Sequence, residues 1–199
     1  MIMDSQKMMI ALLLFLSSSV ILFSQTKSKG EILMQDKMSK YGIEGYQAPE
    51  LNVPLWIDGE GKEITPVKLE DYKGKFKVIY CFQAWCPGCH SRGLPALQKM
   101  VEALKDKEQV AFFAIQTVFE GKHANTLERM LEIQKEYDLS IPFGHDKGNE
   151  TTRNISSTMY NYRTGGTPWF IFIDQEGGVV FNDFHLNTDK AIEYLKAIK

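Results

Sequence analysis

The sequence contains few cysteines, no cluster of basic residues and no internal repeat, and each shortage narrows what the protein can be. Three cysteines are too few to stabilise a small secreted domain by disulfide bonds. A hydrophobic core therefore has to stabilise the fold, and 44% of apolar residues is enough to form one. Lys and Arg form no run and the net charge is −2, which excludes an electrostatic footprint for nucleic acid. With 199 residues, the chain fits one ordinary domain and a short leader.

Long apolar runs are also scarce, and the longest lies near the amino terminus. Met8 to Phe23 contains about sixteen residues without a charge, Lys7 precedes it, and the small, polar Ser24 follows. This order is typical of a secretory signal peptide. The run falls short of the roughly twenty residues that a membrane-spanning helix prefers, and an uncleaved membrane anchor is the alternative.

This leader divides the chain into three parts. We expect residues 1–24 to form the signal peptide or an uncleaved anchor, residues 25–44 a polar linker, and residues 45–199 one folded domain. A domain that follows such a leader works outside the cytoplasm, so we expect a periplasmic location in a bacterium. Contact with the membrane is expected only if the leader stays uncleaved.

Strand and helix patterns alternate along the domain. Short apolar or alternating runs predict strands over Leu51–Ile57, Ile64–Leu69, Phe76–Phe82, Val110–Ile115, Ile141–Gly144, Trp169–Ile173 and Val179–Phe184. Helical spacing predicts helices from Trp85 to about Lys107, over Thr126–Tyr137, around Ile155–Tyr162 and from about Thr188. This order predicts an α/β fold, with a parallel sheet between helices, a hairpin at its start and antiparallel edge strands at its end.

Two of the three cysteines carry a chemical signal. Cys86 and Cys89 enclose Pro87 and Gly88 at the point where a buried strand passes into a helix. The unpaired N–H groups and the dipole at a helix start favour a thiolate, which is the form that attacks a disulfide. We therefore expect Cys86, the exposed member, to attack, and Cys89, one turn further in, to resolve the mixed disulfide. Trp85, directly before the pair, is expected to shield the dithiol or to join the core.

The alternative to redox chemistry is that the same two cysteines belong to a structural metal site. Zinc normally takes four ligands from two close pairs, whereas this chain has no second Cys-x-x-Cys, and its other histidines stand apart at His123, His145 and His185. We therefore favour redox chemistry with no metal and no cofactor. The third cysteine, Cys81, lies in an apolar strand and is expected to be packing.

Three segments carry a resemblance to a known family. They are Leu69 to Lys75, Ala84 to Cys89, and Gly165 to Asp174. In these segments the chain resembles the thioredoxin-like superfamily, most closely the TlpA/ResA-type extracytoplasmic thiol–disulfide oxidoreductases. The resemblance implies a thioredoxin fold with an inserted strand and helix. It also implies disulfide exchange with proteins outside the cytoplasm and re-reduction by a membrane-bound electron donor.

The same resemblance assigns roles and exposes two departures. It implies that Pro168 is a cis-proline facing the dithiol, with the backbone of Thr167 beside Cys86. Many thioredoxins carry a buried acid six residues before the first cysteine, where this chain has Tyr80. The TlpA/ResA-type proteins often carry a Glu three residues after the second cysteine, where this chain has Arg92. The usual proton acceptor for Cys89 is therefore missing from both places.

Three other functions remain as alternatives. A thiol peroxidase would use Cys86 against a peroxide, but Gln83 and Ile79 stand where peroxiredoxins carry Thr and Pro. A non-catalytic metal-binding module would use the two cysteines of the pair with a histidine. A structural adaptor would have kept the motif incidentally and would exchange with no disulfide.

Overall fold

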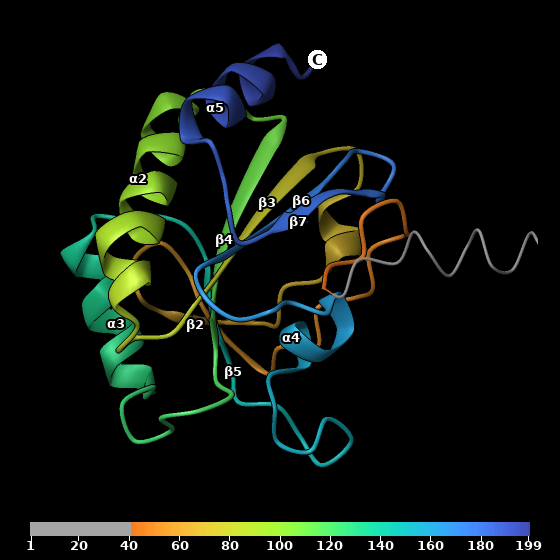
Figure 1. Ribbon diagram of the computed structural model, residues 1–199. Coiled ribbons are helices and arrows are strands. Elements are labelled where there is room, and N and C mark those ends of the chain that lie inside the picture. Colours follow the sequence, from red (N-terminus) through yellow and green to blue (C-terminus); the bar gives the residue numbers. More distant parts are fainter. Residues whose placement is uncertain (1–40) are drawn as a thin grey trace, which may run out of the picture. The chain divides into compact units, whose positions relative to one another are not determined.

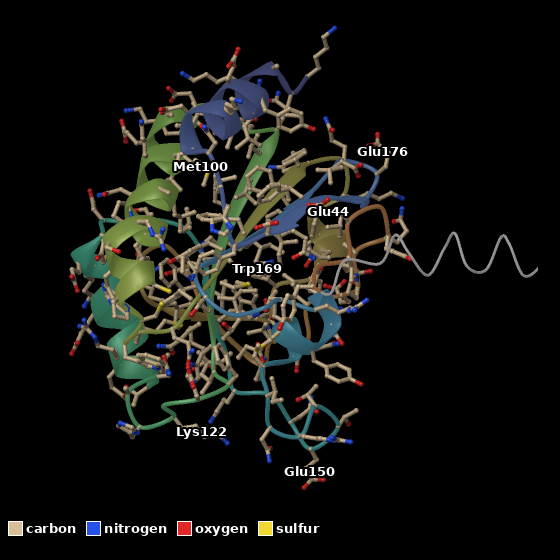
Figure 2. The ribbon with its side chains drawn as sticks, in the orientation of Figure 1. Glu44, Met100, Lys122, Glu150, Trp169 and Glu176 are labelled. Carbon is tan, nitrogen blue, oxygen red and sulfur yellow. The ribbon has the colours of Figure 1, made fainter. Side chains whose placement is uncertain are left out.

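The computed structural model describes residues 41–199. The expected signal peptide and residues 25–40 of the expected linker lie outside the described residues. Residues 41–44, expected as the end of that linker, are hydrogen-bonded to the domain. The N–H of Gly42 donates to the carbonyl of Arg163 at 2.9 Å, and the N–H of Asn182 donates to Glu44 Oε1 at 2.9 Å. Figure 2 shows Glu44 close to the strands of the domain. No helix of residues 41–199 is both long and apolar enough to cross a bilayer.

A seven-stranded sheet forms the centre of the domain (Figure 1). Its strands, in chain order, are β1 (Leu55–Ile57), β2 (Glu63–Ile64), β3 (Phe76–Phe82), β4 (Val110–Thr117), β5 (Phe143–Asp146), β6 (Trp169–Ile173) and β7 (Val179–Asp183). They lie in the order β2-β1-β5-β4-β3-β6-β7. The pairs β3–β4 and β4–β5 are parallel, whereas β1 and β6 pair antiparallel with β5 and β3. The expected mixed sheet is confirmed, with an antiparallel hairpin at each end.

The expected strands before β3 were too long. Regular pairing begins only after Pro54, because proline has no N–H to donate to a neighbouring strand. The second expected strand ends at Ile64, and Leu69–Tyr72 forms a 3-10 helix (η1) instead. The N–H of Leu69 donates there to Glu50 Oε1 at 2.7 Å, so a distant carboxylate satisfies the backbone at this point.

Four α-helices flank the sheet, and a π-helical turn precedes the first of them. They are η2 (Cys89–Gly93, π), α2 (Leu94–Ala103), α3 (Leu127–Glu136), α4 (Ser157–Tyr162) and α5 (Thr188–Ala197). The helices were expected in these places, although α2 ends about a turn earlier than predicted. Side chains of Thr126, Ser156 and Asn187 accept a hydrogen bond from the N–H three residues later and thereby start α3, α4 and α5.

The sheet separates two hydrophobic cores. Helices α2, α3 and α5 cover one face, and α4 covers the other (Figure 1). Alternate residues of β3 point to opposite faces, so Tyr80 joins the first core together with Cys86 and Cys89. Cys81 points to the second core and is fully buried. The interpretation of Cys81 as a packing residue is therefore confirmed, since the sheet lies between it and the dithiol.

A buried carboxylate at the end of β5 organises the loop that leads to α4. Asp146 is fully buried and accepts hydrogen bonds from the Ser156 hydroxyl (2.7 Å), the Thr158 N–H (2.7 Å) and the Thr158 hydroxyl (2.8 Å). Its other oxygen accepts from the N–H groups of Gly148 and Ser157. These five donors replace the water that an ionised carboxylate would otherwise need.

Candidate active site

The dithiol lies where β3 gives way to the helix that leads into α2. Pro87 occupies the first helical position, directly after Cys86. Both thiols are free, and the N–H of Cys89 donates to Cys86 Sγ at 3.3 Å. Cys86 keeps 8% of its surface exposed, whereas Cys89 keeps none. Cys86 is the more accessible thiol, as expected, but it is far from openly exposed, and the loop before β6 contacts it through the carbonyl of Thr167.

That loop contains the expected proline. The Thr167–Pro168 bond is cis, as the resemblance implied. The Cys86 thiol donates to the carbonyl of Thr167 at 3.5 Å. A Cβ added to Gly88 would lie 3.2 Å from Pro168 Cδ, so the glycine lets the loop and the helix start approach closely. The structure therefore brings Cys86, Gly88, Thr167 and Pro168 together at one place.

The buried thiol of Cys89 sits among four polar groups. Burial raises the pKa of Cys89, and the neighbouring Cys86 side chain raises it further. The backbone of Gln83 and the side chain of Thr167 act in the opposite direction. The Tyr80 hydroxyl donates to the carbonyl of Cys89 at 3.4 Å. Burial raises the pKa of Tyr80 well above its ordinary value, so this phenol stays neutral and donates at the position where the resemblance led us to look for an acid.

His90 is fixed by both of its ring nitrogens. Nε2 lies 2.7 Å from the carbonyl of Ala84 and therefore donates to it, and Nδ1 lies 2.9 Å from the hydroxyl of Tyr137. The imidazole thus links the helix start to the loop before Cys86 and to the end of α3. It holds the dithiol loop in place.

A glycine in the π-helical turn controls how closely this helix approaches the sheet. A Cβ on Gly93 would overlap with the hydroxyl of Tyr80 and lie 2.8 Å from Pro168 Cβ. Gly93 is fully enclosed in the fold and has ordinary helical dihedral angles. Its function is therefore close approach, which lets Tyr80, Pro168 and the dithiol share one small volume.

Asn125 ties a second loop to the site. Its Oδ1 accepts from the N–H of Ala84 at 2.7 Å, and its Nδ2 donates to Gln83 Oε1 at 3.1 Å. The same amide donates to the carbonyls of Glu120 and Gly121. Gln83 Oε1 also accepts from the indole of Trp85 at 3.3 Å, and Trp85 is 45% exposed beside the dithiol. One buried amide therefore sets the position of both loops around Trp85.

Replacing Asn125 by Ala is expected to lower the free energy of unfolding by about 1–3 kcal/mol, because buried backbone groups lose their partner. Trp85 fluorescence should change as well, since the loop beneath it is released. Urea unfolding and emission spectra measure both effects. Asn52→Ala, at an exposed position, is the matched control and should change neither. Equal behaviour of the two variants would contradict the role assigned to Asn125.

Sequence reasoning did not single out Gly93, Asn125 or Tyr137. A glycine within a helical pattern is a signal for close approach, and it could have identified Gly93. Asn125 and Tyr137 gave no signal, because their partners lie more than forty residues away in sequence. In the described part of the chain, no hydrogen bond or ion pair links His123, His145 or His185 to Cys86 or Cys89. Among residues 41–199, no three His, Cys, Asp or Glu side chains lie close enough together to hold a metal ion.

Comparison with known proteins identifies the family. A model of the AhpC/TSA family matches residues 45–182. The chain belongs to the AhpC/TSA family. A solved thioredoxin-like superfamily protein is 31% identical, with a TM-score of 0.66, and the match covers 76% of this chain and 95% of that one. The thioredoxin fold and the TlpA/ResA-type resemblance are thereby confirmed for this AhpC/TSA member.

Two further solved structures share the fold of this AhpC/TSA member. A thiol-disulfide isomerase from Corynebacterium glutamicum is 30% identical, with a TM-score of 0.66, covering 77% of this chain and 96% of that one. A 2-Cys peroxiredoxin from Plasmodium vivax is 17% identical, with a TM-score of 0.58, covering 78% and 95%, and shows the fold alone. A search of curated protein sequences gave no significant match.

Proposed function

We propose that this AhpC/TSA protein is a thiol–disulfide oxidoreductase that reduces disulfides of proteins outside the cytoplasm. Its family and its similarity to a thiol-disulfide isomerase support redox chemistry on thiols. The observation that carries the proposal is the arrangement around Cys86: the N–H of Cys89 points at its sulfur, and a buried second thiol stands behind it. An N–H directed at sulfur stabilises the thiolate that attacks a disulfide.

The reaction proceeds in two exchanges. The Cys86 thiolate attacks one sulfur of the substrate disulfide, a mixed disulfide forms, and the first substrate sulfur leaves as a thiolate that takes a proton from solvent. The Cys89 thiolate then attacks Cys86 Sγ, and the second substrate sulfur leaves in the same way. Two electrons pass to the substrate, and Cys86 and Cys89 end as a disulfide. A membrane-bound dithiol donor would then return two electrons to the Cys86–Cys89 disulfide and restore the dithiol.

A stoichiometric assay tests the proposal. The reduced protein, freed of small thiols, is mixed with an equimolar disulfide-bonded protein, and free thiols on both are alkylated and counted by mass. One substrate disulfide should open for each Cys86–Cys89 disulfide that forms. An unchanged substrate together with an unchanged dithiol would refute the function.

The second exchange is expected to depend steeply on pH. Because burial raises the pKa of Cys89, its thiolate is the minor form throughout neutral pH. Below that pKa each added pH unit multiplies the fraction of Cys89 thiolate tenfold. The release of substrate from the mixed disulfide should therefore accelerate about tenfold per pH unit between pH 6 and pH 8. Single-turnover decay of the mixed disulfide, at constant ionic strength, measures this rate. A rate that is flat across this window would show that Cys89 is already ionised there.

A thiol peroxidase is the second candidate, supported by the family match and by the fold shared with a peroxiredoxin. Cys86 would take one peroxide oxygen as a sulfenic acid, and Cys89 would close the disulfide with loss of water. Gln83, three residues before Cys86, is held by Asn125 and Trp85 and supplies no hydroxyl to a peroxide. Peroxide consumption by the pure protein, lost in Cys86→Ser, would favour this candidate over disulfide reduction.

A further inference from the structure

A groove of about 510 Å³ opens beside the dithiol. The start of α2 forms one wall, the segment between β7 and α5 forms the other, and Pro168 and Phe170 lie between them. The volume falls in the range that accommodates a small ligand or a few residues of peptide. Since Pro168 belongs to both the groove and the dithiol site, the groove adjoins the dithiol.

Arg92 stands at the end of the groove nearest the dithiol. A Cβ built on Gly88 would lie 3.8 Å from Arg92 Nη2 and 4.0 Å from Cys86 Sγ. The guanidinium and the reactive sulfur are therefore less than about 8 Å apart. The guanidinium also lies over the ring of Phe184, 5.9 Å from its centre, which holds the charge at the groove wall.

The charges of the groove are predominantly positive. Arg92 and Lys99 are its cations, and Asp189 is the one carboxylate among its described lining residues. Asp189 is already paired with Lys99 at 2.7 Å. No carboxylate of residues 41–199 forms an ion pair with Arg92. In a protein of net charge −2, this is a local positive site whose main cation has no acidic partner in the fold.

We propose that the groove binds the polypeptide beside the substrate's reactive cystine and selects a segment with a Glu or Asp side chain, which pairs with Arg92. The inference rests on the proposed function and names its substrate class. Residues two apart in an extended chain point to the same side and are separated by about 6.4–6.8 Å. An acidic residue two positions from the reactive cysteine would therefore meet Arg92 while that cysteine meets Cys86.

Two synthetic peptides with one internal disulfide test the proposal. They differ only two positions from the reactive cysteine, where one carries Glu and the other Gln. The rate of peptide reduction by the full chain is followed by Trp85 fluorescence in a stopped-flow instrument. We expect the second-order rate constant for reduction by the reduced protein to be about tenfold higher for the Glu peptide at low salt, with a smaller ratio at high salt.

Matched variants localise the preference. Arg92→Gln should bring the ratio near one, and Arg92→Glu should favour a peptide with Lys at the same position. Lys73→Gln removes one positive charge at an exposed position outside the groove and should keep the full ratio. The proposal is overturned if wild type reduces both peptides equally, or if Arg92→Gln keeps the preference.

The outcomes also separate this proposal from the function on which it rests. If neither peptide is reduced by any variant, the proposed oxidoreductase function fails. If both are reduced at the same rate, only the acidic specificity fails. Sedimentation supplies a further check: a wild-type dimer that dissociates in Arg92→Gln would assign the groove to a second copy of the chain and contradict peptide binding.

Discussion

Replacing Cys86 by Ser is expected to lower the rate of disulfide reduction by at least about a thousandfold, because the hydroxyl is a far weaker nucleophile than the thiolate it replaces. Cys86 is the one residue of the pair that keeps any exposed surface, and its sulfur accepts a hydrogen bond from the N–H of Cys89. Cys89 is fully buried and cannot take over the first attack. Single-turnover reduction of a disulfide-bonded protein measures the loss.

Replacing Cys89 by Ser should have a different result. Cys86 still attacks, but the mixed disulfide has no resolving thiol and accumulates, which intact mass reports as the protein plus its substrate. Cys81→Ala is the control: Cys81 lies in the opposite core, so the variant should lose about 1 kcal/mol of stability at most and keep its rate. A Cys86→Ser protein that still reduces its substrate would assign the attack to another group.

Replacing Gly93 by Ala is expected to lower the free energy of unfolding by about 2–4 kcal/mol, an unusual cost for adding a methyl group to a helix. The new Cβ would overlap with the Tyr80 hydroxyl and press on Pro168, and neither neighbour can yield within a packed core. Urea unfolding measures the loss, and disulfide reduction should slow because the helix start carries the dithiol.

Gly88→Ala is the matched control for this prediction. Both glycines are helical, but a Cβ on Gly88 would meet Pro168 at 3.2 Å, so its neighbours need to move only by a few tenths of an ångström. We expect a cost below about 1 kcal/mol. Removing the hydroxyl in Tyr80→Phe/Gly93→Ala should recover part of the loss, since the two sites are in contact. Equal costs for Gly93→Ala and Gly88→Ala would contradict the close approach.

Much of the fold could be predicted from the sequence because it depends on local patterns. The mostly apolar run of β3, in which Lys77 is the one charged residue, and the spacing of α2 predicted a buried strand followed by a helix. The two cysteines at their junction then placed the dithiol within one turn of the strand's end. The early strands were predicted too long because proline, and a long-range hydrogen bond from the Leu69 N–H to Glu50, override the alternation of apolar residues there.

The supporting groups of the site could not be predicted, because each depends on contacts between distant segments. Asn125 reaches Ala84 across the sheet's carboxyl edge, and Tyr137 reaches His90 from the end of α3. Asp146 reads in sequence as an ordinary polar residue after a strand, but five donors surround it in the fold. Cys86, which is only 8% exposed, likewise contacts the carbonyl of Thr167, 81 residues later in the sequence.

The central claim is that Cys86 and Cys89 form one reversible two-electron couple. The most direct test equilibrates the protein in glutathione buffers of graded potential, alkylates free thiols and reads each cysteine by mass. Disulfide exchange predicts a single transition in which Cys86 and Cys89 become protected from alkylation together, with a slope of about 30 mV per tenfold change in the ratio, while the labelling of Cys81 stays unchanged. Independent transitions for the two cysteines, or no transition at any potential, would contradict it.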